Sequence, residues 1–392
     1  MKKSLLNLFT VASGIAVGNL YLIQPLLGEL SKDLHTSTAQ NGWLVTATQV
    51  GYATGISLVL PLGDVLERRK MAPIMLGLAG LSLVAAGVSS SYLMLLVAMA
   101  ALGITTISGQ LLVPLTNELS DDQTRGKNSA KVVSGMILGI LLARTISGFL
   151  TNLLGWHIAL VTFGLFNLTL MLLMRNVIPE LPKPAKQNYF ALLAGAPRIL
   201  WRNPRAFGLM LVSASALFIF SVVWTSITFY FTAEPYRWTP AQIGLWGLVG
   251  AAGALGARVV GPLLDKGYAR IITICAWLVF AASLAIGSFA DTSIWFVVVM
   301  LVAMDLGSQG INVNNQTRLL TTFAEARSRI NAAYVTTNFI AASIGSAVTA
   351  SLWHQVGWSG FMWLCSLLSV CALGGWFAVG YRDNLRSKPL AS

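Results

Sequence analysis

Two ionisable side chains lie deep inside long apolar stretches of the chain. Arg144 stands in the stretch 130–152 and Asp305 in the stretch 292–317, each about 13 or 14 residues from its start. If these stretches are helices that span a bilayer, a single unpaired charge there costs roughly 2.5–3.5 kcal/mol on insertion scales. Each side chain is therefore expected to face a partner or water.

The chemistry that this pair could do is proton binding and release. We predict that Asp305 is the proton-binding carboxylate and that Arg144 controls its protonation by moving closer or further away. The alternative is a static ion pair, or two charges satisfied by backbone groups. Only the first interpretation requires the distance between the two charges to change.

Uncharged polar and aromatic side chains occur in the same kind of apolar surroundings. Polar groups in lipid need a partner or water, so we place them on the interior face of their helices. As a set they predict a wet, mostly uncharged cavity, although for any single one a hydrogen bond between helices is the alternative. The residues are Asn19, Tyr21, Gln24, Gln110, Trp224, Tyr230, Gln309, Asn312, Tyr334 and Asn338.

The composition indicates that lipid surrounds these stretches. Of 392 residues, 55% are apolar and only 10% are charged, and the mean hydropathy is +0.71. Soluble globular chains carry roughly 25% charged residues, so the polar surface is too small to coat a soluble protein. The formal charge of +12 comes in short bursts of Lys and Arg without a continuous basic face, which argues against nucleic acid as a partner.

Twelve apolar stretches are long enough to cross a bilayer core, which takes about 20 residues of helix. They are 7–30, 39–62, 72–90, 92–116, 130–152, 157–175, 206–232, 241–264, 271–290, 292–317, 330–352 and 359–380. The Pro-rich, basic stretch 176–205 predicts a linker with a short interfacial helix around Tyr189–Trp201. With both termini in the cytoplasm, only Lys32 and Arg237 among the loop cations fall outside, as the positive-inside rule requires.

The chain also repeats itself. Three pairs of segments match at nearly one offset: 38–42 with 240–244, 61–64 with 262–265, and 125–156 with 327–358. A parallel repeat of this kind predicts two six-helix bundles with the substrate site near the midplane between them. We therefore expect an N-terminal bundle at 1–175, a cytoplasmic linker at 176–205 and a C-terminal bundle at 206–392.

A charged motif follows the second apolar stretch and recurs after the eighth. The copies read Pro61-Leu-Gly-Asp64-Val-Leu-Glu-Arg68-Arg69-Lys70 and Gly261-Pro-Leu-Leu-Asp265-Lys266-Gly267. They resemble the loop motif of the major facilitator superfamily, and the resemblance extends over essentially the whole chain. The first copy departs from the family pattern at Leu60 and Glu67, where Gly is usual.

The resemblance implies a charged latch that holds a cytoplasmic gate shut. Asp64 is expected against a helix N-terminus of the other half, while Arg68 reaches acids such as Glu118. The alternative is that these charges only mark the topology. The expected gate residues are Asp64, Arg68, Arg69, Glu118, Arg125, Asp265, Lys266 and Arg327.

The fifth stretch resembles the motif typical of the family's antiporters. It reads Gly139-Ile-Leu-Leu-Ala143-Arg144-Thr-Ile-Ser147-Gly148, so the small residues are kept but Arg144 replaces the usual proline. The arginine that the family usually has in the fourth stretch, near Met99, is absent. Spans one, four, seven and ten line the cavity in this family, which implies a substrate site among the polar residues named above.

Together these features predict an all-α membrane protein with the twelve-helix major facilitator fold. The expected function is secondary active transport of a small molecule by alternating access, as a proton-coupled efflux antiporter in the bacterial inner membrane. The alternatives are a proton symporter or uniporter that imports a small polar solute, and a transporter-fold sensor or lipid-handling protein. We expect a monomer with no cofactor, metal site or enzymatic activity, because no catalytic or metal-ligating constellation occurs.

Overall fold

The computed structural model describes residues 1–181, 188–254, 266, 268–323 and 326–380, and within them the regular structure is helical. The N-terminal part contains α1 Lys3–Gly18, α2 Leu27–Asp33, α3 Thr38–Thr54, α4 Arg68–Gly87, α5 Tyr92–Thr105, α6 Ser108–Glu118 and α7 Arg125–Val177. After α8 Tyr189–Arg202 follow α9 Pro204–Thr232, α10 Pro240–Ala254, α12 Ala269–Gly287, α13 Trp295–Thr322 and α14 Arg327–Gly380. A helix, α8, is therefore present where the sequence predicted a short interfacial one, and its position at the membrane interface stays a prediction.

The first, second and fourth predicted spans are irregular in their interior. Two short 3-10 turns, Asn19–Tyr21 and Gln24–Leu26, join α1 to α2, and α5 gives way to α6 after Thr105. A π-turn at Gly55–Val59 and a 3-10 turn at Leu60–Asp64 follow α3. Non-helical backbone at membrane depth is tolerated only where protein or a water-filled cavity surrounds it. These breaks therefore mark the interior of the bundle.

Two long helices are each divided at one glycine. Gly155 in α7 has φ 80° and Gly357 in α14 has φ 65°, so both lie in the left-handed region that a residue without a Cβ occupies at little cost. A tryptophan follows each glycine, and both indoles, Trp156 and Trp358, are buried. Each long helix is thus two consecutive spans, with the division where the sequence predicted one.

Nine helical segments of the described chain are long and apolar enough to cross a membrane. Because α7 and α14 are each divided at a glycine, these nine amount to eleven spans. The segment that would supply a twelfth begins with α10, whose described part ends at Ala254. The count of twelve is consistent with the structure and stays a prediction.

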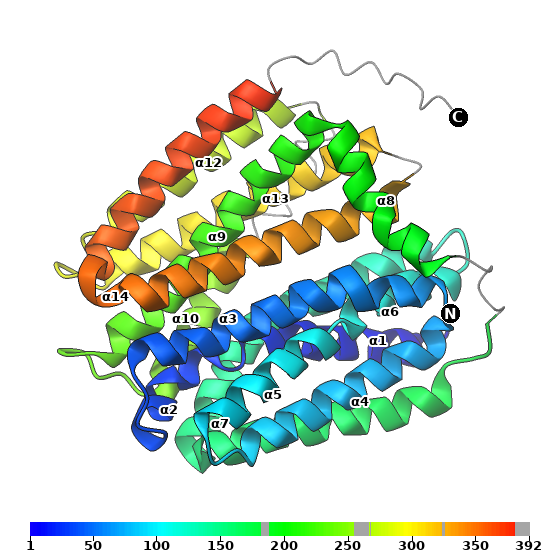
Figure 1. Cartoon of the computed structure of the whole chain (residues 1–392), viewed down its shortest axis with the longest axis horizontal. Coiled ribbons are helices and arrows are strands. Elements are labelled where there is room, and N and C mark those ends of the chain that lie inside the picture. Colours follow the sequence, from blue (N-terminus) through cyan, green and yellow to red (C-terminus); the bar gives the residue numbers. More distant parts are fainter. Residues whose placement is uncertain (182–187, 255–265, 267, 324–325, 381–392) are drawn as a thin grey trace.

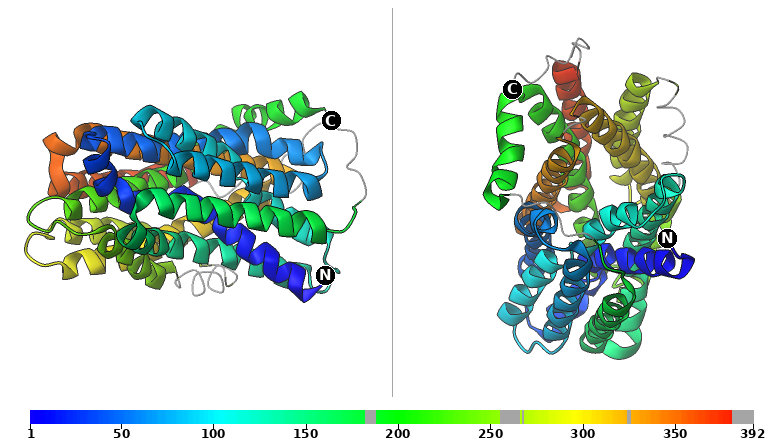
Figure 2. Two further views of the ribbon diagram at one scale, coloured as in Figure 1. Left: turned by 90° about the horizontal axis from the view of Figure 1, so that it is seen from below. Right: turned by 90° about the vertical axis from the view of Figure 1, so that its right-hand side faces the viewer.

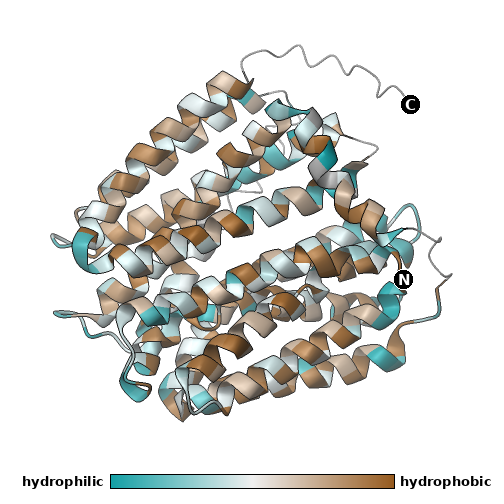
Figure 3. Cartoon of the chain, viewed as in Figure 1, coloured by the Kyte–Doolittle hydropathy of each residue, from teal (hydrophilic) through white to brown (hydrophobic). Residues whose placement is uncertain are grey.

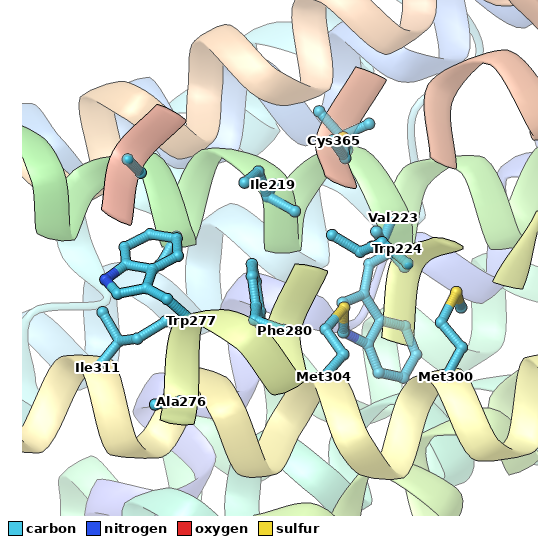
Figure 4. Packing of buried hydrophobic residues seen from close by; sticks show 14 of the residues in the cluster. Ile219, Val223, Trp224, Ala276, Trp277, Phe280, Met300, Met304, Ile311 and Cys365 are labelled. Carbon is cyan, nitrogen blue, oxygen red and sulfur yellow. The ribbon is translucent and has the colours of Figure 1, made fainter. Parts of the chain in front are cut away.

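The helices run roughly along one axis in two groups, which the lower and upper parts of Figure 1 and the right-hand view of Figure 2 show. We call α1–α7 the first group and α9–α14 the second group. One cluster of buried apolar side chains is built from the second group alone (Figure 4), and two others are built mainly from the first. We keep the predicted bundles at 1–175 and 206–392 as a proposal; α9 begins slightly earlier, at Pro204, because proline suits the first helical position.

Most loop arginines gather at one end of the molecule, which we call the basic end. It carries the starts of α4, α7 and α14, the whole of α8 and the N-terminus, whose amino group lies 3.6 Å from Asp121. Hydrophobic residues dominate the length of the helices, and hydrophilic ones concentrate toward both ends (Figure 3). Large apolar side chains such as Leu153 and Trp295 are more than two-thirds exposed along the flanks, at 73% and 71%, as a lipid-facing surface requires.

Candidate transport site

Arg144 lies in the first part of α7 and is only 2% exposed. Its Nε donates a hydrogen bond of 2.7 Å to Oε1 of Gln24, and Nη1 donates one of 3.4 Å to the carbonyl of Ile140. The ring centroids of Tyr21 and Trp224 lie 4.4 and 3.9 Å from its Cζ. Desolvated cation–π contacts of this kind contribute about 2 kcal/mol each. Together they stabilise a positive charge inside the apolar bundle.

The local backbone explains why these groups meet. Tyr21 and Gln24 belong to the two 3-10 turns between α1 and α2, and Pro25 within the second turn cannot donate a helical hydrogen bond. On the other side, α10 packs directly on α7 because it presents glycine. A Cβ at Gly244 would lie 2.6 Å from the carbonyl oxygen of Arg144. A Cβ at Gly247 would lie 3.3 Å from the Cβ of Arg144.

Asp305 is 7% exposed on α13 and lies on the other side of α10. A Cβ at Gly250 would lie 2.5 Å from its Oδ2 and 3.3 Å from Cζ2 of Trp224. Trp224 therefore neighbours both the buried cation and the buried carboxylate. Arg144 interacts electrostatically with Asp305, but the two do not form a salt bridge within the described part of the chain. The described structure thus lacks the static Arg144–Asp305 ion pair that was the alternative to proton binding.

Figure 4 shows the indole of Trp224 directed from α9 toward α13, with Met300 and Met304 beside it. Its ring is 3% exposed, and its Nε1 has no hydrogen-bond partner among the described residues. The ring is thus held by apolar packing, and its polar edge is left without an acceptor.

The remaining predicted cavity residues do not share one site. Asn19 donates to Thr106 and Asn167 at 3.2 and 3.1 Å, which ties three spans of the first group together. Tyr334 contacts Ser213 at 2.6 Å and donates to Oδ1 of Asn312 at 3.0 Å, which ties three helices of the second group. Asn19, Asn312 and Tyr334 thus form hydrogen bonds between helices, which was the alternative to contact with a ligand.

Three further predicted residues are not among the contacts that the described chain makes with Arg144. Tyr230 stands about 9 Å further along α9 than Trp224 and donates to the carboxylate of Asp291 near the far end. Gln309 is half-buried on α13, and Asn338 is buried on α14, where its Oδ1 has no partner in the described chain. The structure therefore brings Tyr21, Gln24, Trp224 and the two charges together, and it does not bring Tyr230 to them.

A cavity of about 480 Å³ opens between the two groups at the basic end. Gln110 lies on its wall, as do side chains of the two turns after α3 and of α4, α6, α13 and α14, while α8 covers part of it with Leu192, Leu193 and Leu200. Its charged lining residues are Asp64, Arg68, Arg327 and Arg329. The cavity therefore combines charges from both groups, with arginine in excess.

The predicted latch residues line or surround this cavity. Arg68 donates to the carboxylates of both Asp64 and Glu118, so it reaches Glu118 as the sequence predicted. Asp64 is engaged by Arg68 of its own group, in place of the expected helix N-terminus from the other half. Arg69 bonds to Glu67 at 3.2 Å and to Glu180 at 2.9 Å.

The other gate residues have surface contacts. Arg125 pairs with Asp122 at 2.7 Å, and Arg327 donates to the carbonyl of Leu320 at 3.3 Å. Lys266 is exposed in a turn, and Asp265 lies outside the described residues. Hydrogen bonds from Lys70 and then Arg69 lower the pKa of Glu67, so this carboxylate stays ionised in mild acid and is unsuited to carry the coupling proton.

A polar contact between the groups was missed by the sequence analysis. Gln49 of α3 bonds to Ser221 of α9 at 3.2 Å, and Ser346 of α14 donates to Gln49 at 3.2 Å. The hydroxyls of Thr46 and Ser346 lie 2.8 Å apart. The sequence contains a sign of this contact, because Gln49 is a long polar side chain in the middle of the second apolar stretch and needs a partner there. Arg144 and Ser346 each lie 19 residues after the start of their helix, and α7 and α14 both start at the basic end, so these contacts join the groups at about the depth of Arg144.

An aromatic pair separates the cavity from the buried charges. The rings of Tyr52 on α3 and Phe339 on α14 meet edge to face, with centroids 4.4 Å apart. The hydroxyls of Ser57 and Thr336, which line the cavity, lie 3.0 Å apart about one turn nearer the basic end. Gln110 donates to the Tyr52 hydroxyl at 3.2 Å. A molecule moving from the cavity toward Arg144 would have to displace this pair.

A bundle of apolar helices long enough to cross a bilayer, with charges buried between two groups, is the architecture of an integral membrane protein. The family model of the Major Facilitator Superfamily matches residues 9–345 and again 209–392, and the chain belongs to this family. An uncharacterised transporter, YgaY, from Escherichia coli O157:H7 is 33% identical over 98% of both chains. A probable transporter, SCO4007, from Streptomyces coelicolor is 28% identical over 96% of this chain and 87% of its own.

A solved structure shares the fold. The bacterial homologue of the human lysosomal transporter Spinster, in an inward-facing and unoccupied conformation, matches with a TM-score of 0.81 at 14% identity. The match covers 97% of this chain and 98% of that one. This protein is therefore a membrane transporter of the major facilitator type.

Proposed function

We propose that this protein is a proton-coupled antiporter that exports a small molecule, with Asp305 as the proton-binding group. The observation that carries the proposal is the placement of Asp305 and Arg144. The two charges are buried on α13 of the second group and α7 of the first, and Trp224 neighbours both. A carboxylate buried at membrane depth without a salt bridge is a group whose protonation can be coupled to movement.

The geometry supplies a physical reason for coupling. Arg144 belongs to the first group and Asp305 to the second, so rocking of the groups changes their separation. When Arg144 is close, it favours the ionised carboxylate, and when it is remote, protonation is favoured. A proton would thus be taken up in one conformation and released in the other, which is what alternating access requires.

The distribution of contacts supports a resting state that is open at the basic end. The cavity lies there, while further from the basic end than Arg144 the groups are in contact, with Gly42 of α3 against Ala350 of α14 and Gly28 of α2 against Thr232 of α9. If the basic end faces the cytoplasm, as the positive-inside rule predicts, the cavity collects substrate from the cell interior. An exporter would load its substrate from this state, whereas import by symport or by uniport, the alternative, would release substrate into it.

Flux measurements in proteoliposomes test the proposal. The purified protein is reconstituted with an imposed pH gradient, and a panel of labelled solutes and a pH-sensitive dye report substrate and proton movement together. Antiport predicts that substrate accumulates in the compartment that supplies the protons, which leave it as substrate enters. Movement of both in the same direction would establish symport, and flux indifferent to the gradient would establish a uniporter and remove the coupling role of Asp305.

A further inference from the structure

The guanidinium of Arg144 has more donors than the protein around it satisfies. Nε and Nη1 bond to Gln24 and to the carbonyl of Ile140, whereas Nη2 is buried without a hydrogen-bond partner among the described residues. Nε1 of Trp224 is a second buried donor in the same condition. A buried charged donor without a hydrogen bond is unfavourable. Such a site is therefore complementary to a ligand that brings a hydrogen-bond acceptor.

The two donors belong to one site but to different helix groups. The Trp224 ring centroid lies 3.9 Å from Cζ of Arg144, and the tryptophan is on α9 while the arginine is on α7. The acceptors already in place are neutral, an amide oxygen and a backbone carbonyl. A fixed guanidinium with an adjacent N–H binds an oxyanion most strongly, because such hydrogen bonds are charge-assisted.

We propose that the substrate is a small organic carboxylate, whose carboxylate group accepts hydrogen bonds from Nη2 of Arg144 and Nε1 of Trp224. This inference rests on the proposed transport function and names its substrate class. The ligand would bridge the two helix groups, so its binding favours the conformation in which they approach each other. Asp305 is the protein's own anion near Arg144, and the substrate carboxylate would compete with it for the guanidinium.

The cavity at the basic end suits the entry of an anion. Three arginines, Arg68, Arg327 and Arg329, line it against the single carboxylate of Asp64. A cavity with an excess of one sign of charge concentrates solutes of the opposite sign. The same lining would repel organic cations, and Arg144 would repel them again at the site.

Polar and aromatic groups connect this cavity to Arg144. Gln110 on the cavity wall donates to the Tyr52 hydroxyl, Tyr52 and Tyr21 belong to one buried cluster, and the Tyr21 ring lies 4.4 Å from Cζ of Arg144. These groups give a carboxylate hydrogen-bond donors along the way and offer aromatic surface to the apolar part of the molecule.

Matched pairs of small molecules test the inference on the full-length protein in lipid nanodiscs. The panel contains benzoate, cinnamate, hexanoate and succinate, each beside its primary amide, with benzylamine as a cation. Dissociation constants come from ligand-dependent shifts of thermal unfolding and from isothermal titration calorimetry. We expect at least one carboxylate to bind about tenfold or more tightly than its amide, since only the carboxylate makes charge-assisted bonds. A panel in which no carboxylate binds, or in which amides or the amine bind as tightly, overturns the inference.

Variants assign the effect to the two donors. Arg144→Gln should abolish the preference for carboxylate over amide, and Trp224→Phe, which keeps an aromatic ring without Nε1, should weaken carboxylate binding several-fold. Arg175→Gln removes an exposed arginine from the end of α7 and should leave binding unchanged. Circular dichroism and gel filtration verify that each variant is folded. Arg144→Lys, which keeps the charge, covers the case in which Arg144→Gln does not fold, and it should bind carboxylate more weakly than the wild type.

Asp305→Asn separates this inference from the proposed function. It removes the competing anion and should bind carboxylate at least as tightly as the wild type, even though proton coupling is lost. Carboxylate binding without any pH-driven flux in the wild type would contradict the coupling proposal and leave the substrate class standing. Proton-driven flux of an amide or an amine would contradict the substrate class and leave the coupling standing.

Discussion

The indole of Trp224 lies against the guanidinium of Arg144, with 3.9 Å between the ring centroid and Cζ, across the boundary between the two helix groups. The same indole approaches Asp305 through the space that Gly250 leaves. One aromatic side chain from α9 thus neighbours a cation on α7 and a carboxylate on α13. Any rocking of the groups must change this arrangement, and the predictions below follow from that relation.

Replacement of Asp305 by Asn should uncouple transport. The amide cannot exchange a proton at physiological pH, so uptake driven by a pH gradient into proteoliposomes should fall to the level of empty liposomes. Exchange of labelled for unlabelled substrate without a gradient should persist, because it needs no net proton movement. Asp121→Asn, at an exposed loop, is the control and should behave as the wild type. Gradient-driven uptake that survives in Asp305→Asn would eliminate the proposed role.

Introduction of a methyl group at Gly250 should disturb the same carboxylate from another helix. The new Cβ would lie 2.5 Å from Oδ2 of Asp305 and 3.3 Å from Trp224, so Asp305 must shift. We expect gradient-driven flux to fall about tenfold or more, while the free energy of unfolding changes by about 1 kcal/mol or less, because alanine is the better helix former. Gly374→Ala, with nothing within 4 Å of its Cβ, is the matched control. Equal flux in the two variants would count against the placement of Asp305.

A disulfide between the two groups at the depth of Arg144 should arrest the transport cycle. Thr46 and Ser346 have hydroxyls 2.8 Å apart, close enough for a Thr46→Cys/Ser346→Cys pair to form a bond upon oxidation. The experiment uses a background in which Cys275, Cys365 and Cys371 are replaced by serine. Flux should stop with oxidant and recover with reductant, whereas either single variant should be insensitive. Continued transport by the cross-linked protein would show that this contact does not open.

Loss of the Arg68 bridge should change transport rate more than stability. Arg68 is partly exposed and pairs with Asp64 and Glu118, and exposed ion pairs contribute only about 0–1 kcal/mol. We therefore expect Arg68→Gln to lower the free energy of unfolding by less than about 1 kcal/mol, yet to alter the flux several-fold. Lys70→Gln, which loses only its surface contact with Glu67, is the control. An unchanged rate in Arg68→Gln would favour the alternative that these charges only mark the topology.

A close approach of α1 to α7 should not tolerate a side chain. A Cβ at Gly14 would lie 2.6 Å from the backbone carbonyl oxygen of Gly135, and backbone cannot move aside as a flexible side chain can. We expect Gly14→Ala to destabilise the protein by about 1–3 kcal/mol, seen as a lower midpoint of thermal unfolding in detergent. Gly126→Ala, where nothing lies within 4 Å, should leave the midpoint unchanged or raise it slightly.

The sequence alone determined the class of fold, the approximate ends of most helices and the two charges buried inside apolar stretches. Apolar length sets where a helix can cross lipid, and the cost of an unpaired charge in lipid singles out Arg144 and Asp305 before any coordinates are known. The helix α8 and the divisions at Gly155 and Gly357 follow from equally local signals.

Only the tertiary structure decided which polar side chains share a site. Tyr21, Gln24 and Trp224 meet Arg144, whereas Tyr230 contacts Asp291 and Asn19 bonds within its own group. The contact of Gln49 with Ser221 and Ser346 was likewise decided there. The physical reason is that hydropathy depends on each residue's own chemistry, while a site depends on how helices far apart in the sequence rotate and pack. Glycines such as Gly244, Gly247 and Gly250 set that packing through contacts with partners that the order of residues does not reveal.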